Sequence, residues 1–458
     1  MVPVGLFQYL VLHLLPANTY TNMKLVHKLP IFIILLLTLL FANLRANKRD
    51  GGHGYCLNIC GDARGYYAWL PAIFIYHDLN FHFFDSVEKR DSTCGVNIQA
   101  NIQDYRHIFE GIDCDKYYPG ASLMMLPFFA IAHFTTLHAT AYPANGYTLL
   151  YFKVMPFCCD FYFLLGMLFF LMILDKLKCT TLQKCLTIIF LIFGSNIVFY
   201  IVDAPLYSHV YSFALISAFL YYAFCLKENY KVLYIALICF LAGWIMIARP
   251  VNICIVFMLP FILGSRLPVI WRETLLKPIR LSALLCGLIM PVILLMLYKV
   301  STGHYFIYSY GPEVFNFKHP HLLHYLFSYD NGVLPYTPLF FTPLLLLFAW
   351  YRPEYKNMIA GTLLTLAAMV YVNSSWWCWW YGTSFGARSI LDFLPLFGIL
   401  IALSLQVKPR RYLYILPVYL LCCGLTMLLY HENSACHYMG LYPVTDYWKA
   451  VNDGLGIK

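Results

Sequence analysis

Apolar and polar stretches alternate along this chain in blocks about as long as a membrane crossing. Most apolar runs approach the ~20 residues that a helix needs to span a bilayer, although a few are shorter and one is longer. Long continuous apolar runs are not the alternating pattern of a membrane β-barrel, so they predict helices. The runs lie near 29–45, 119–140, 148–174, 182–202, 206–226, 232–248, 251–265, 281–299, 335–351, 357–373, 386–406 and 411–430.

Composition agrees with this pattern. Apolar residues make up 61% of the chain and charged residues only 12%, whereas soluble domains average roughly 25% charged residues. The sequence therefore predicts an all-α polytopic membrane protein with about 11–13 transmembrane helices. The net charge of +9 comes mainly from short connectors. No basic tract is interleaved with aromatic residues, so nucleic acid is not an expected partner.

The connectors predict an orientation. Lysine and arginine gather in 227–231, 266–280, 352–356 and 408–411, and they are sparse in 203–208, 249–252, 300–334 and 374–386. The positive-inside rule then places the first set in the cytoplasm and the second outside. Lys24 and Lys28 place the start of the first run inside, so the loop that follows it faces outward.

One connector disagrees with this count. The stretch Asp175 to Lys178 is basic in character, yet counting runs from the N-terminus places it outside. Either one early run does not cross the bilayer, or one crossing is missing from this count. The run at 148–174 is the suspect, because it is long and contains Lys153, Pro156 and Asp160.

These features suggest a division of the chain. Residues 1–22 read as an extension before a start at Met23, and the first run reads as a retained anchor because no small-residue cleavage site follows it. A transmembrane core is expected over 23–299, with an extracytoplasmic loop at 46–118 that carries interfacial helices. A second outer loop (300–334), C-terminal transmembrane helices (335–430) and an outer tail (431–458) follow.

The first loop holds ten of the chain's 22 carboxylates, which suggests that chemistry takes place there. Four cysteines in it would pair as disulfides if the loop is exported. No cysteine or histidine spacing indicates a zinc site, and no metal-binding residue is assigned. Walker A, Rossmann, HExxH and nucleophile-elbow motifs are absent from the sequence. The loop cysteines are Cys56, Cys60, Cys94 and Cys114.

Asp62 is the candidate catalytic residue. It lies in Gly61-Asp62-Ala63-Arg64, just after the first run, where a carboxylate can act as a general base on an acceptor hydroxyl or amine. The following stretch, 64–74, mixes aromatic and aliphatic residues and predicts a helix lying in the membrane interface. The alternative is that Asp62 only caps this helix.

Two arginines are candidates for binding a phosphate. Arg249 precedes Pro250 at an external turn between two apolar runs, and its alternative role is to reach the headgroups from a helix end. Arg388 follows Gly382 and Gly386 in a tryptophan-rich stretch and opens a span from outside, where backbone N–H groups favour an anion. Its alternative role is an i,i+4 ion pair with Asp392.

The remaining candidates for substrate binding lie in the same outward-facing parts of the chain. His209 opens a span, where it otherwise serves as a satisfied polar helix end, and Tyr336 otherwise anchors the interface. The full set of expected substrate-binding residues is Arg64, Tyr66, Tyr67, Asp78, Tyr118, His209, Arg249, Tyr336 and Arg388.

In their order, these features resemble those of polytopic GT-C glycosyltransferases. The sequence has an apolar anchor, an outer loop with Asp62, and Tyr118-Pro119-Gly120-Ala121 leading into a Pro-containing run. Ser208-His209, Arg249-Pro250-x-Asn252, a second outer loop and Gly-x-x-x-Gly-x-Arg at 382–388 follow. The chain is most similar to the protein O-mannosyltransferase and aminoarabinose-transferase group and its uncharacterised bacterial relatives. The resemblance covers most of the chain as architecture and short strings.

The resemblance implies an activity. Such enzymes take a sugar from a polyprenyl-phosphate donor at the outer face of the membrane, here expected to be a bacterial inner membrane. A carboxylate activates an acceptor lipid, glycan or protein, the anomeric centre inverts, and arginines stabilise the departing phosphate. By position, Asp62 is the base and Arg249 and Arg388 face the phosphate. Many relatives have two adjacent acids where Asp62 has Gly61 and Ala63 as neighbours, so a need for a divalent metal stays open.

Two other classes of function compete with this one. A transporter or flippase for a lipid-linked glycan would place charged or broken helices near the midplane, whereas most ionisable residues here lie outside the apolar runs. Another integral-membrane transferase, such as an acyltransferase or glycan ligase, is the third alternative.

Overall fold

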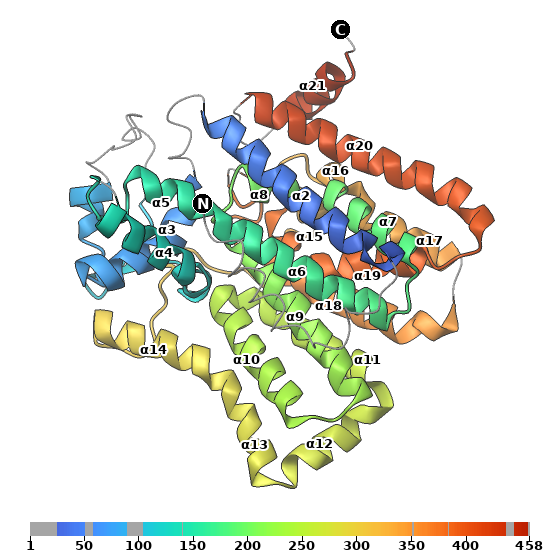
Figure 1. The fold of residues 1–458 in the computed structure, drawn as a ribbon, viewed down its shortest axis with the longest axis horizontal. Helices are drawn as coiled ribbons and strands as arrows, with labels where there is room; N and C mark the ends of the chain where they lie inside the picture. The colour runs from blue at the N-terminus through green and yellow to red at the C-terminus, as the bar shows by residue number, and fades with distance from the viewer. Residues whose placement is uncertain are drawn as a thin grey trace.

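The computed structural model describes residues 25–50, 58–88, 104–139, 141–349, 352–382, 384–436 and 444–456, and most of them are helical (Figure 1). Within these residues, eight helices are long and apolar enough to cross a membrane, and three further apolar helices are shorter. The chain is therefore a multi-pass, all-helical membrane protein, as its hydrophobic pattern predicts. Cys56 and Cys94 lie outside the described residues, while the thiol of Cys114 is hydrogen-bonded to the carbonyl of His107.

The helices follow the order of the apolar runs. The first half contains α2 (Leu25–Asp50), α3 (Asp62–Pro71), α4 (Gly120–Ala139), α5 (Leu149–Val154), α6 (Pro156–Lys176), α7 (Thr181–Phe193), α8 (Ile197–Val202), α9 (Ser208–Glu228) and α10 (Val232–Ala248). The second half contains α11 (Met258–Leu263), α12 (Leu267–Leu275), α13 (Pro278–Leu285), α14 (Ile289–Thr302), α15 (Leu322–Phe327), α16 (Val333–Tyr336), α17 (Thr342–Ala349), α18 (Lys356–Ser374), α19 (Leu394–Ser404), α20 (Tyr412–Cys436) and α21 (Val444–Gly454).

Local sequence signals explain several helix ends. Thr180 and Gln183 form a reciprocal capping box at the start of α7, which satisfies two backbone N–H groups that the helix leaves open. Pro156 stands at the first position of α6, where its missing N–H is not needed. Gly303 ends α14 in the left-handed conformation, with φ of 80°.

The first loop folds into a buried layer over one end of the bundle. Its antiparallel hairpin pairs β1 (Arg106–Phe109) with β2 (Ile112–Asp115). The sequence predicts a helix in the membrane interface over 64–74, and the structure has a helix, α3, whose residues 63–71 are all buried within the protein. Its aromatic side chains take part in this packing: Trp69 contacts the ring of Phe81 in the same loop, and Tyr67 contacts that of Tyr147, just before α5, both edge-to-face.

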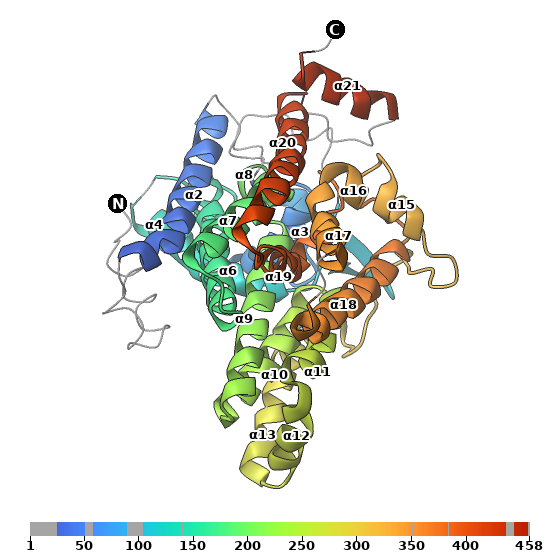
Figure 2. The ribbon, with the colours of Figure 1, turned by 90° about the vertical axis from the view of Figure 1, so that its right-hand side faces the viewer.

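The connectors rich in lysine and arginine lie together, and we call this the basic end. Lys176 forms an ion pair with Glu228, which joins the connector after α6 to the one after α9. Gln406 donates to the carbonyl of Leu177 at 2.9 Å, and Arg352 donates to the carbonyl of Gln406 at 2.8 Å. Figure 2 shows α12 and α13 at one extreme of the molecule and α21 at the other.

Contacts of α4 resolve the disagreement in the predicted topology. The start of α4 meets the end of α10, where Trp244 donates to the carbonyl of Gly120 at 2.9 Å. Its later residue His133 lies 2.6 Å from the Tyr151 hydroxyl of α5, while Tyr162 of α6 reaches back to the carbonyl of Met124. Helix α4 therefore runs antiparallel to α5 and the first half of α6, away from the basic end.

These contacts predict that the run at 119–140, although long and apolar enough to cross a membrane, is the one that does not reach the other side. The run at 148–174, which the sequence made the suspect, continues from α5 through α6 as far as Lys176 at the basic end. With α4 confined to the far half, the connector at 175–178 lies on the same side as the other basic connectors. The remaining runs then alternate in the sense that the positive-inside rule requires.

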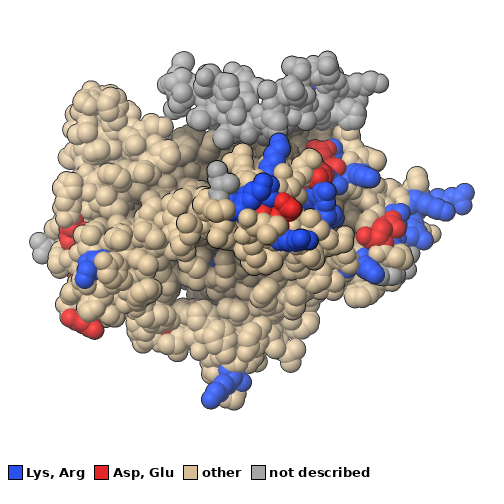
Figure 3. All heavy atoms as spheres, turned by 90° about the horizontal axis from the view of Figure 1, so that it is seen from below, with Lys and Arg blue, Asp and Glu red and all other residues tan. Residues whose placement is uncertain are grey.

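A space-filling view agrees with burial in lipid. Figure 3 shows Lys, Arg, Asp and Glu gathered in a few patches, with wide surfaces of other residues between them. Many large apolar side chains are exposed on the outside of the helices, among them Leu39 (68%), Phe134 (65%) and Leu421 (75%). Such surfaces are unfavourable in water and are expected against hydrocarbon.

This topology can be tested by placing short epitope tags after Pro143 and after Lys178, both of which are exposed. We expect the tag after Pro143 to be accessible from the same side as a reference tag after Gly111, an exposed residue before α4, and the tag after Lys178 from the opposite side. Protease or antibody access in intact and opened vesicles measures this. Tags after Gly111 and Pro143 on opposite sides would mean that α4 crosses the bilayer.

Candidate functional site

An ion pair joins the first outer loop to the segment before α19. Asp62 is the first residue of α3, and its Oδ2 lies 2.7 Å from Nη2 of Arg388, the first residue of the 3-10 helix η10 (Arg388–Phe393). The Asp62 side chain remains 20% exposed, so a ligand can reach it, while that of Arg388 is 9% exposed. Asp62 therefore does not serve as a cap: the N-cap position is Gly61, and no side chain caps α3.

Glycine is required immediately before Asp62. Gly61 has φ of 59°, a left-handed conformation that other residues adopt at a cost. A Cβ atom at this position would also lie 2.3 Å from the Tyr207 hydroxyl. The sharp entry into α3 that results directs the Asp62 carboxylate toward the segment carrying Arg388.

Aromatic rings hold the two candidate arginines beside each other. The Arg388 guanidinium lies 5.2 Å from the ring centre of Tyr207 and 5.6 Å from that of Tyr381. The Arg249 guanidinium lies 5.9 Å from the same Tyr381 ring. Rings at these distances attract cations and restrict a planar guanidinium. Two positive charges thus share one aromatic partner, although 139 residues separate them in the sequence.

The second carboxylate of the cluster is Asp392, which is fully buried. Its Oδ1 accepts a hydrogen bond from Nδ1 of His209 at 2.8 Å, and its Oδ2 lies 3.2 Å from Nε of Arg249. With its Nδ1 proton donated to Asp392, His209 presents Nε2 to Nη1 of Arg249 at 3.3 Å. A buried charge needs such partners, and Asp392 has two.

The alternative considered for Arg388, an i,i+4 ion pair with Asp392, is therefore not formed. These residues belong to a 3-10 helix, with three residues per turn, so side chains four apart point in different directions. Arg388 turns to Asp62 while Asp392 turns to Arg249. Asp62 of α3 thus pairs with Arg388 of η10, and Asp392 of η10 pairs with Arg249 at the end of α10. These two ion pairs join the three segments.

Electrostatics keep Asp62 ionised. Burial alone would raise the pKa of its carboxyl, but the attraction of Arg388 and a hydrogen bond with Tyr117 outweigh that effect and hold the pKa below its ordinary value. Tyr66 lies close by, and its hydroxyl accepts a hydrogen bond from Ser208 at 3.0 Å. Burial raises the pKa of Tyr66 to about 12, so its phenol remains neutral.

Of the nine expected substrate-binding residues, the structure brings four together with Asp62: Tyr66, His209, Arg249 and Arg388. Tyr118 lies at the edge of this group, with its ring 5.9 Å from that of Tyr310, which itself contacts Tyr117. The other four lie elsewhere.

Arg64 and Tyr67 face the interior of the first loop. Arg64 Nη1 lies 3.5 Å from Glu88, a buried carboxylate that also accepts hydrogen bonds from Tyr105 and Tyr147. The Tyr67 hydroxyl donates to the carbonyl of Gly146. Both residues therefore pack on the side of α3 that faces away from Asp62.

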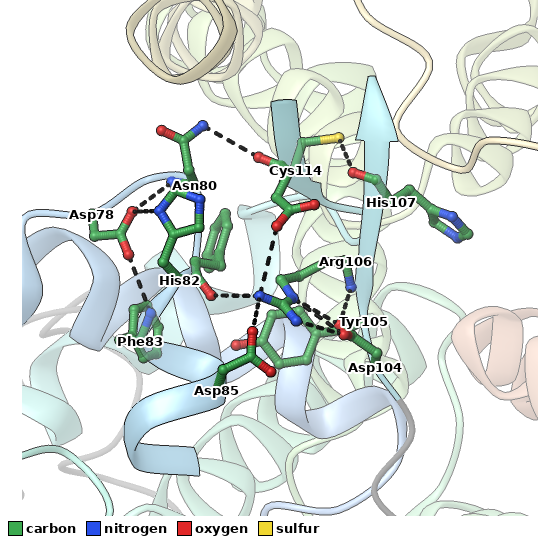
Figure 4. Close-up of polar contacts among 12 residues, drawn as sticks. Asp78, Asn80, His82, Phe83, Asp85, Asp104, Tyr105, Arg106, His107 and Cys114 are labelled. Atoms are coloured by element: carbon green, nitrogen blue, oxygen red, sulfur yellow. Dashed lines mark hydrogen bonds and ion pairs between the residues drawn. The ribbon is translucent and has the colours of Figure 1, made fainter. Parts of the chain in front are cut away.

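Asp78 and Tyr336 have local structural contacts. The Asp78 carboxylate accepts from the backbone N–H groups of Asn80 at 3.0 Å and Phe83 at 3.2 Å, which stabilises a turn (Figure 4). The Tyr336 hydroxyl donates to the carbonyl of Tyr329, and its ring packs beside Gly386. A Cβ atom at Gly386, whose φ is 65°, would lie 2.8 Å from Tyr336 Cβ, so glycine allows this close approach.

Most acids of the first loop are structural. Arg106 is surrounded by Asp85 at 3.0 Å, Asp104 at 2.8 Å and Asp113 at 3.7 Å, and these contacts tie the hairpin to the rest of the loop (Figure 4). The concentration of carboxylates that drew attention in the sequence thus has mainly a folding role. Within the described residues, no group of three or more His, Cys, Asp or Glu side chains is arranged to hold a metal ion.

Sequence reasoning missed the tyrosines of the cluster and the true partners of Asp392. Tyr207 directly precedes Ser208-His209, and Tyr381 directly precedes Gly382. An aromatic residue adjoining a singled-out motif was the available signal, but it is weak in a chain in which aromatic residues are 18% of the total. Tyr117 could have been found in the same way, beside Tyr118.

No family model, no curated protein and no solved structure matches the chain.

The buried ion pair between Arg64 of α3 and Glu88 predicts that the stability of the protein depends on pH. Burial raises the pKa of Glu88 from 4.5 to about 7, although Arg64 and two tyrosine hydroxyls favour the ionised form. Between these values the folded protein holds a proton that the unfolded chain has lost, so stability falls as pH rises through that window. We therefore compare the thermal unfolding temperatures of Glu88→Gln and wild type. We expect the variant's temperature minus that of wild type to be larger at pH 8 than at pH 5.

Glu354→Gln is the matched control, because Glu354 is an exposed glutamate, with a side chain 55% exposed, that pairs with Arg352, which remains charged throughout this pH range. Its difference from wild type should be nearly the same at both pH values. A Glu88→Gln difference that does not change with pH would contradict the raised pKa.

Proposed function

We propose that this protein is a membrane glycosyltransferase with a GT-C-like architecture, which transfers a sugar from a polyprenyl-phosphate donor to an acceptor outside the cytoplasm. The observation that carries the proposal is the Asp62–Arg388 ion pair, with Arg249 against the same Tyr381 ring. A carboxylate able to take a proton and two guanidinium groups able to receive a phosphate are thus in one cluster, opposite the basic end.

The proposed reaction assigns a role to each group. Asp62 accepts the proton of an acceptor hydroxyl or amine as the acceptor atom bonds to the anomeric carbon. The bond between that carbon and the phosphate oxygen breaks from the opposite face, so the configuration inverts. The electron pair leaves with the polyprenyl phosphate, whose added negative charge Arg388 and Arg249 stabilise in a poorly hydrated setting.

Position relative to the bilayer supports the same proposal. The cluster lies at the ends of α3, α9, α10 and η10, at the level of the connectors that are poor in lysine and arginine. If the positive-inside rule holds, this level faces outside the cytoplasm, where a lipid-linked sugar presents its headgroup. In a bacterium this would be the outer face of the inner membrane. Acceptor identity, sugar identity and metal dependence are not part of the proposal.

A flippase without transferase chemistry is the alternative, and one observation bears on it. Arg45 and Asp160 form an ion pair within two candidate spans, with Nη1 and Oδ1 3.0 Å apart. Transporters use such intramembrane charges near the midplane. Here Arg45 lies one turn from Lys48, which pairs with Asp203 at 2.9 Å at the end of α8. The pair therefore belongs to the helix ends near the cluster, which favours an anchoring role.

The test is transfer of a labelled sugar from a polyprenyl-phosphate donor in membranes, comparing wild type with Asp62→Asn. A general base contributes ~10²–10⁴-fold to a rate, so we expect transfer to fall at least about 100-fold. Asp85→Asn is the matched control, because it makes the same change at a carboxylate of the same loop that pairs with Arg106. Equal transfer by wild type and Asp62→Asn would exclude Asp62 as the base. Glycan translocation without transfer would favour the flippase.

The two arginines should differ in the same assay. The planar guanidinium of Arg388 contacts two aromatic rings and pairs with the Asp62 carboxylate through Nη2, so a lysine cannot reproduce its planar contacts. We expect Arg388→Lys to reduce transfer about 100-fold, in the range for loss of one transition-state donor, and Arg249→Lys to reduce it less. Similar losses for both variants would contradict the different roles assigned to the arginines.

A further inference from the structure

Asp62 occupies the part of Arg388 that a phosphate would use. The carboxylate meets Nη2 through a single oxygen, at 2.7 Å. Arg388 Nε is buried and has no hydrogen-bond partner among the described residues. A guanidinium fork binds two oxygens at once when the ligand presents them side by side. Of the guanidinium nitrogens available to such a ligand, Nη2 is therefore paired with Asp62, the proposed base, and Nε has no partner among the described residues.

A phosphodiester is better suited to this fork than the Asp62 carboxylate is in its present position. It presents two unbound oxygens that can engage Nε and a terminal nitrogen of Arg388 together. The rings of Tyr207 and Tyr381 keep the guanidinium in place while its ligand changes. A phosphate arriving here must share Arg388 with Asp62 or displace it.

The other arginine does not offer the same exchange. Arg249 Nε faces Asp392, whose side chain is fully buried and is fixed from its other oxygen by His209. Removing Asp392 from Arg249 would leave a buried carboxylate with one neutral partner, which is costly. Asp62 is 20% exposed and lies on a different element from Arg388, so its side chain can turn to solvent or substrate.

We propose that Asp62 is the resident counter-ion of Arg388, and that a donor phosphate displaces it, so that the carboxylate becomes available to the acceptor only after the donor has bound. This inference rests on the proposed function and adds an order of events to it: donor first, acceptor second. The Asp62–Arg388 ion pair thus has two roles. Before the donor binds, it joins α3 to η10; after the donor binds, Asp62 acts as the base and Arg388 binds the phosphate.

Displacement would also strengthen the base. In the empty protein the attraction of Arg388 is the main force that opposes the effect of burial on the pKa of Asp62. Once Arg388 binds the phosphate, that attraction is shared with a second anion, and the negative phosphate lies nearby. Both changes raise the pKa of the carboxyl and make it a better proton acceptor.

The distinguishing experiment measures binding without catalysis. The full-length protein in detergent is titrated with a polyprenyl monophosphate that carries no sugar. Because Asp62 competes with this lipid for Arg388, we expect Asp62→Asn to bind it about tenfold more tightly than wild type. Asp62→Ser should bind more tightly as well, which guards against a misfolded asparagine variant, and Asp85→Asn should bind as wild type does.

A double variant identifies Arg388 as the shared group. If the gain in affinity comes from freeing Arg388, Asp62→Asn should give no gain in a protein that already carries Arg388→Gln. A gain that persists in the Arg388→Gln background would overturn the inference, since it would come from general removal of negative charge.

The remaining outcomes separate the two proposals. Equal affinity of wild type, Asp62→Asn and Asp62→Ser for the lipid would overturn displacement and leave the glycosyltransferase proposal intact. Failure of every folded variant to bind polyprenyl monophosphate would count against the proposed function itself, and the inference that depends on it would fall as well.

Discussion

The candidate site depends on the rule that a charge taken out of water must be paired. Four charged side chains meet at one end of this helical bundle, and each is neutralised by a partner from another part of the chain: Asp62 by Arg388, and Asp392 by Arg249. Because the partners come from α3, η10 and the end of α10, these pairs fix how the segments meet. The same interactions that hold the site together give it the chemistry of a base beside two phosphate ligands.

The architecture could largely be predicted from hydrophobic pattern alone, because a membrane span must be long, apolar and helical. The pattern alone does not say whether α4 crosses the bilayer, because α4 has the length and composition of a span but packs antiparallel to α5 and the first half of α6. Composition reflects the surroundings of a helix and does not fix its position along the membrane normal. The basic connector at 175–178, which disagrees with the count, is the signal in the sequence that one early run needs another assignment.

At the site, residue types were more predictable than their partners. Asp62, His209, Arg249 and Arg388 stood out because polar groups are rare in such a chain, and the fold brings these four together. Their pairing could not be predicted, since it depends on the direction of side chains in η10. An α-helix would have placed Asp392 beside Arg388, whereas the 3-10 geometry separates them. Arg64 and Tyr67 lie on the side of α3 away from Asp62 and Tyr66, because successive residues of an α-helix are turned by about 100°.

The contact between Gly386 and Tyr336 connects the cluster to the far end of the chain. The Tyr336 ring lies 5.7 Å from that of Tyr447, in the amphipathic helix α21 that follows the last long helix. The loop leading to Arg388 thus packs against the Tyr336 ring, which contacts Tyr447 of α21 on its other side. A shift of α21, for instance when lipid or a binding protein contacts it, would be transmitted through these rings to the Arg388 guanidinium. Helix α21 therefore supports the segment that carries this arginine.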